Sequence, residues 1–116
     1  MPLVLNLVSQ EASVFVPAIW PLEVTNALVK ALRRKHISRE DLFEYAQHLA
    51  ELRVTVETEG VGNAFTEVLA LAERYQLTTY DAAYLELAQR RKIPLATVDK
   101  NLVQVAGAIG LPVLAV

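Results

Sequence analysis

The chain has no cysteine, only four glycines and no long apolar run. The missing cysteines exclude a disulfide scaffold and a thiolate zinc site. The glycines form no phosphate-binding loop, which argues against a nucleotide-binding domain. No apolar stretch approaches the roughly 18 residues that a membrane span needs. The N-terminus lacks the positive region of a signal peptide, so we expect a cytoplasmic protein that makes no contact with a membrane.

The composition is that of a folded globular protein. Of 116 residues, 53% are hydrophobic and 21% are charged. This length is enough for one domain and too short for two, so we expect a single domain at 1–116. The net charge of −2 predicts no strong overall attraction to nucleic acid.

Strand and helix patterns alternate along the chain. Residues 3–10 fit either a helix or a strand. The alternation that follows predicts an α/β fold with a parallel sheet covered by helices on both faces. We expect strands at 13–16, 54–56, 93–98 and 112–116, and helices at 21–35, from Ser38 onward, and at 63–75, 80–91 and 101–109.

Single residues predict where several helices begin and end. Ser38 with Asp41 three residues later fits a capping box. Thr78 or Thr79 can cap the next-to-last helix. Gly110 fits the position after the last one.

Two helices are expected to turn apolar side chains to the core. The helix at 80–91 is apolar almost all round, which is typical of a buried helix. Tyr80 and Tyr84 could stack on RNA bases, but their helical spacing favours the core. In the helix at 63–75 the inward positions are expected to be Phe65, Val68, Leu69 and Ala72.

Acidic residues stand at the ends of elements that can converge in such a fold. Glu23 and Asp81 open helices, and Asp99 ends a strand. Ligand sites in α/β sheets form beyond the carboxyl ends of the strands. Carboxylates brought together repel unless a cation neutralises them, and Mg²⁺ or Mn²⁺ is the usual ion for an all-oxygen site. The pattern therefore indicates a divalent metal site.

Each acid also has a purely structural explanation. An acid in the first turn of a helix gains roughly 0.3–1 kcal/mol from the helix dipole, which would account for Asp81 or Glu23. Asp99 could cap the helix that follows it. Polar neighbours weaken these explanations, because Thr97 lies on the same side of the strand as Asp99 and Asn26 on the same face as Glu23.

The acids lie in segments that together resemble the PIN-domain family, in particular the VapC-type toxins of bacterial toxin–antitoxin pairs. The resemblance covers residues 13–116. It is strongest in Val-Pro-Ala-Ile-Trp-Pro-Leu-Glu-Val-Thr-Asn-Ala-Leu (16–28), Leu-Thr-Thr-Tyr-Asp-Ala-Ala-Tyr-Leu-Glu-Leu-Ala (77–88) and Pro-Leu-Ala-Thr-Val-Asp-Lys-Asn-Leu (94–102).

This resemblance implies an endoribonuclease that depends on Mg²⁺ or Mn²⁺, acts on RNA and is paired with a small antitoxin protein. It implies that Glu23, Asp81 and Asp99 are its catalytic and metal-binding acids. Thr97 and Asn26 match polar positions beside the family's site. The bound ion would polarise the scissile phosphate and activate a water for in-line attack.

The chain departs from the family at its N-terminus. The family's pattern opens with a central strand that ends in Asp, and this chain has no such Asp. Either the chain is a shortened relative that lacks the first strand and first helix, or Leu3-Val4-Leu5-Asn6 is that strand with Asn6 in the Asp position. We favour the shortened form.

Two expectations follow from the shortened form. A missing central strand would leave unpaired edges, so we expect a homo-oligomer, possibly with exchanged elements. Three carboxylates should hold a cation more weakly than four, so we expect reduced or absent ribonuclease activity. The alternative function is an inactive PIN-like interaction module that oligomerises or binds an antitoxin.

Overall fold

The computed structural model of the chain describes residues 4–8 and 13–114, and these residues divide into two compact units. A helical unit spans Ile19–Arg53. A sheet unit holds the residues before Ile19 and from Val54 onward. Among the described residues, no helix is long and apolar enough to cross a membrane.

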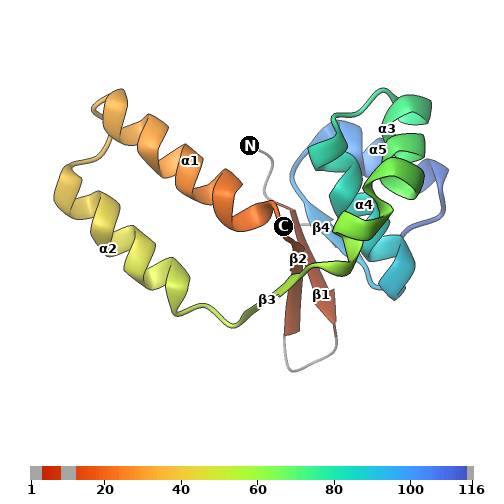
Figure 1. Cartoon of the computed structure of the whole chain (residues 1–116), viewed down its shortest axis with the longest axis horizontal. Coiled ribbons are helices and arrows are strands. Elements are labelled where there is room, and N and C mark those ends of the chain that lie inside the picture. Colours follow the sequence, from red (N-terminus) through yellow and green to blue (C-terminus); the bar gives the residue numbers. More distant parts are fainter. Residues whose placement is uncertain (1–3, 9–12, 115–116) are drawn as a thin grey trace. The chain divides into compact units, whose positions relative to one another are not determined.

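The helical unit is a hairpin of two helices, α1 (Trp20–Arg33) and α2 (Arg39–Ala50), which lie side by side (Figure 1). The predicted capping box of α2 is confirmed. The Ser38 hydroxyl accepts a hydrogen bond of 3.0 Å from the Asp41 N–H, and the Ser38 N–H donates one of 3.1 Å to Asp41 Oδ2. Two donors at the start of α2 are thereby satisfied.

The sheet unit contains a five-stranded mixed sheet in the order β3-β2-β1-β4-β5. β2 pairs with β3 and β4 pairs with β5 in parallel, whereas β1 runs antiparallel to both β2 and β4. Four of the strands therefore end at the same edge. The strands are β1 (Val4–Val8), β2 (Ser13–Pro17), β3 (Val54–Glu57), β4 (Leu95–Thr97) and β5 (Val113–Leu114).

The expectation that the first strand is missing is wrong, because β1 occupies the centre of the sheet. The sheet is also not wholly parallel. Only residues 9–12 separate β1 from β2, and a parallel connection needs a dozen or more residues. The chain therefore reverses direction between the two strands.

The reversed direction of β1 also argues against the alternative in which Asn6 takes the position of the family's Asp. Asn6 pairs with Phe15 in the middle of β2 and with Leu95 at the start of β4. It does not stand at their carboxyl ends, where the family's pattern has an Asp. Because β1 fills the central place in the sheet, there is no gap at that place that a strand from a second copy would have to fill. The homo-oligomer stays a prediction.

Helix α4 (Thr79–Arg91) is the central helix of the sheet unit. It packs against β1, β2 and β4, while α5 (Lys100–Ala108) packs against β4 and β5. The prediction that α4 is buried is confirmed for most of its length, and Tyr84 is only 1% exposed. Its fully or almost fully buried residues are Ala82, Tyr84, Leu85, Glu86, Leu87 and Ala88.

The segment predicted as one helix at 63–75 has a different geometry. It consists of a 3₁₀ turn (Glu59–Asn63), a π-helical turn (Ala64–Val68) and helix α3 (Leu69–Tyr75). Val68 and Ala72 are buried as expected, but Phe65 and Leu69 are exposed. A π turn adds a residue to the helical repeat, so the 3.6-residue period used for the prediction fails there.

Candidate functional site

Asp81 lies in the first turn of α4 and is half-buried. Its N–H donates a hydrogen bond of 3.1 Å to the hydroxyl of Thr78, which confirms Thr78 as the cap of this helix. The cap fixes the backbone of the first turn. Asp81 therefore has a defined position at the start of the most deeply buried helix.

Asp99 lies two residues after the end of β4 and is the N-cap of α5. Its Oδ1 accepts a hydrogen bond of 2.9 Å from the Leu102 N–H, so the structural explanation given for this acid is confirmed. The Asp99 N–H donates a 3.0 Å hydrogen bond to the hydroxyl of buried Thr97. Thr97 thus holds the backbone of Asp99, and Oδ2 of Asp99 has no hydrogen-bond partner among the described residues.

Asp81 and Asp99 belong to elements that meet at one end of the sheet. Helix α4 ends at Lys92, which takes a left-handed conformation with φ of 56°, and β4 begins at Leu95. With so short a connection, a helix packed on the sheet must run opposite to the strand that follows it. The first turn of α4 therefore points to the end of the sheet at which β4 stops.

Glu23 and Asn26 belong to the other unit. Glu23 lies in the first turn of α1, as predicted, and Asn26 is exposed on the same helix. Within residues 4–8 and 13–114, no three His, Cys, Asp or Glu side chains are grouped so that they could hold a metal ion. The gathering of Glu23 with Asp81 and Asp99 therefore stays a prediction. Their chemistry fits the expected ion, because carboxylate oxygens are the preferred ligands of Mg²⁺ and Mn²⁺.

A buried ionic cluster, which we call the Arg–Glu cluster, links β3 to α4. It consists of Glu57, Glu86, Arg90 and Arg91. Arg90 Nε donates to both oxygens of Glu86 at 2.8 and 3.1 Å, and its Nη1 donates to Glu57 Oε2 at 2.9 Å. Arg91 Nε also donates to Glu57, and Asn63 Nδ2 donates to Glu86 Oε1 at 2.8 Å.

The cluster balances two buried anions with two cations. The side chains of Glu57 and Glu86 are each 4% exposed. Burial by itself would raise the pKa of Glu57, but the hydrogen bonds from Arg90 and Arg91 outweigh it and hold this pKa below its usual value. The guanidinium of Arg91 also stacks over the Phe15 ring, 4.5 Å from its centre. Paired in this way, the charges tolerate burial.

The Arg–Glu cluster was not predicted from the sequence. One signal was present, since Glu86 and Arg90 are four residues apart on a helix and such pairs are neighbours. Glu86 also lies on a helix that is otherwise apolar almost all round, where an isolated charge would be costly. Its partner Glu57 comes from a distant strand and could not be found from spacing.

The lowered pKa of Glu57 predicts a loss of stability in acid. Its pKa is lower in the folded than in the unfolded chain, so its contribution is complete above about pH 4.5 and disappears as the pH falls through the folded value. We expect the free energy of unfolding in urea to fall more steeply below pH 4.5 in the wild type than in Glu57→Gln. Glu59→Gln is the control, because its side chain is 70% exposed and contacts the same Arg90. Equal pH slopes for the wild type and Glu57→Gln would contradict the prediction.

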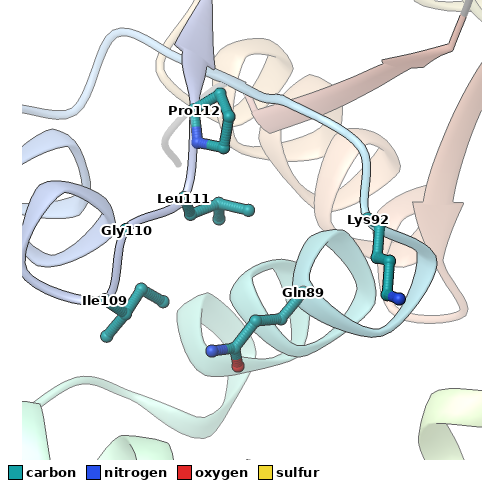
Figure 2. Close-up of a pocket in the computed structure, with 6 residues that line it drawn as sticks. All are labelled: Gln89, Lys92, Ile109, Gly110, Leu111 and Pro112. Carbon is teal, nitrogen blue, oxygen red and sulfur yellow. The ribbon is translucent and has the colours of Figure 1, made fainter.

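A pocket of about 340 Å³ lies away from the acids (Figure 2). It is formed by the last residues of α4 and by the turn between α5 and β5, whereas Asp81 and Asp99 stand at the first residues of the same helices. None of its lining residues is acidic, so it is not part of the proposed metal site. The lining residues are Gln89, Lys92, Ile109, Gly110, Leu111 and Pro112.

Comparison with known proteins agrees with the resemblance seen in the sequence. The PIN domain family matches residues 3–108. A relative from Pyrobaculum aerophilum, described as ribonuclease VapC3, is 29% identical over 90 residues, which cover 78% of this chain and 69% of the relative. The family match includes both units and all three candidate acids, and the chain belongs to the PIN-domain family.

Proposed function

We propose that this protein is a metal-dependent endoribonuclease and the toxin of a toxin–antitoxin pair. The family match and a relative described as a ribonuclease support the class of activity. The observation that carries the proposal is the position of Asp81 and Asp99, at the first turns of two helices that begin at the same end of the sheet. Its partners would be an RNA substrate and a small antitoxin protein.

In this proposal Glu23, Asp81 and Asp99 hold one Mg²⁺ or Mn²⁺ ion. When bound, such an ion polarises the phosphate and makes a water more acidic. Thr97 contributes by holding the backbone of Asp99 through its buried hydroxyl. The cap at Thr78 does the same for the first turn of α4. The backbone at Asp81 and Asp99 is therefore held by hydrogen bonds within the protein.

The activity is expected to be weak, because Glu57, the acid at the carboxyl end of β3 beside β2, is already bound by Arg90 and Arg91 and so is not a fourth ligand. The central strand β1 carries Asn6 in its middle and runs in the opposite direction. This observation favours the second candidate function, a PIN-like module that binds an antitoxin without cleaving RNA. A site with fewer charged ligands binds divalent cations less tightly.

Cleavage of a labelled single-stranded RNA separates the two functions. We expect slow cleavage with Mn²⁺ and none after addition of EDTA. The melting temperature should rise with Mn²⁺ in the same buffer, since a ligand at 100 times its Kd stabilises the folded state by about 2.7 kcal/mol. Absence of both cleavage and a melting shift would favour the non-catalytic module.

A further inference from the structure

Tyr80 is an exposed aromatic residue on the mostly buried helix α4. It is 56% exposed, although the sequence pattern placed it in the core. Tyr84, one turn further along the same face, is 1% exposed. The two tyrosines differ because Tyr80 lies in the first turn of α4, where this face of the helix is open to solvent, although Ala82 on another face of the same turn is buried. The large aromatic ring therefore stands beside Asp81 at the start of α4.

The backbone beneath this ring is fixed from both sides. On one side Thr78 accepts the hydrogen bond from the Asp81 N–H. On the other side Ala82 is fully buried against Val68 and Ala72. An exposed ring on this fixed backbone offers a flat face on which a base can stack.

The two sequence neighbours of Asp99 are both exposed. Val98 is 58% exposed, and Lys100 is exposed on the other side of the acid. An aromatic ring, an apolar side chain and a cation thus adjoin the two acids. Bases stack on aromatic rings and phosphates attract cations, so these features suit a single nucleic-acid strand.

We propose that Tyr80 stacks against an unpaired base of the RNA and positions the strand at the acids. The inference rests on the proposed function and deepens it, because it names the residue that holds the RNA strand at the acids. A paired base has its faces covered by its neighbours and cannot stack on Tyr80. Duplex RNA of the same sequence should therefore be a poor substrate.

The test compares Tyr80→Ala, Tyr80→Leu and Tyr80→Phe with the wild type. Stacking on an aromatic ring predicts that Ala and Leu raise KM for single-stranded RNA about fivefold or more, with kcat little changed. Phe should stay within about twofold of the wild type, since it keeps the ring. The control is Phe65→Ala, because Phe65 is also an exposed aromatic residue (91%) but lies away from the acids. It is two residues from Asn63, whose side chain donates to Glu86 in the second half of α4.

Binding of an RNA that contains 2-aminopurine, measured without metal, separates this inference from the proposed function. Quenching of its fluorescence by the wild type and not by Tyr80→Leu would support stacking even if no RNA is cleaved. Cleavage by the wild type with an unchanged KM in Tyr80→Ala would overturn the inference and leave the nuclease proposal intact. Equal losses in Tyr80→Phe and Tyr80→Ala would also overturn it, and so would a wild type that neither binds nor cleaves RNA.

Discussion

Replacing Asp81 with Asn is expected to reduce Mn²⁺-dependent RNA cleavage by about 100-fold or more. The change removes one charged ligand while it keeps the shape of the side chain. Mutation of a residue that only supports a metal ligand typically lowers metal affinity or activity 10–100-fold. Loss of a ligand itself should lower the activity at least as much. The rate of cleavage of single-stranded RNA at saturating Mn²⁺ measures this effect.

Asp41→Asn is the matched control for this experiment. Asp41 occupies the same position in the first turn of α2 that Asp81 occupies in α4, three residues after the N-cap. A dipole or capping role would affect both variants in the same way, by roughly 0.3–1 kcal/mol of stability. Equal cleavage by Asp81→Asn and the wild type would assign Asp81 to helix stability alone.

Replacing Arg90 with Ala is expected to destabilise the protein by about 3 kcal/mol, the lower end of the usual cost of breaking a buried pair. Arg90 binds both Glu57 and Glu86, and its loss leaves two nearly buried carboxylates with fewer partners. We take the lower end because the Arg90 side chain is itself 25% exposed. Such a loss is a large part of the roughly 5–15 kcal/mol by which domains are stable. Urea unfolding at pH 7 measures it.

Two further variants test the cause of this loss. Arg74→Ala removes an exposed arginine from the last turn of α3, which corresponds to the position of Arg90 in α4, and should change stability by less than about 1 kcal/mol. Adding Glu86→Gln to Arg90→Ala should recover part of the stability, because Glu86 loses its cationic partner in Arg90→Ala whereas Glu57 keeps Arg91. A double variant less stable than Arg90→Ala would contradict this explanation.

Local signals in the sequence predicted much of the fold. The capping box at Ser38, the cap at Thr78 and the burial of Tyr84 were all confirmed, because each depends on neighbours within a few residues. The resemblance to the PIN-domain family was confirmed for the same reason, since its motifs are short and continuous.

The remaining features depend on distant contacts or on geometry that breaks the regular period. The central place of β1 in the sheet depends on its pairing with β4, far along the chain. Phe65 was misplaced because a π turn interrupts the helix, and Tyr80 because its face of α4 is open to solvent at the first turn. The Arg–Glu cluster needs Glu57 and Arg90 to meet across separate elements. For the candidate site, the positions of Asp81 and Asp99 at element ends could be predicted, whereas their grouping with Glu23 depends on tertiary structure.

The most direct test of the proposed site is a titration with Mn²⁺, in which electron paramagnetic resonance reports the free ion. We predict that the wild type binds one equivalent and that Glu23→Gln, Asp81→Asn and Asp99→Asn each weaken this binding at least tenfold, while Asp41→Asn does not. Wild-type affinity in Glu23→Gln, together with weak binding in the other two variants, would show that these acids do not share one ion.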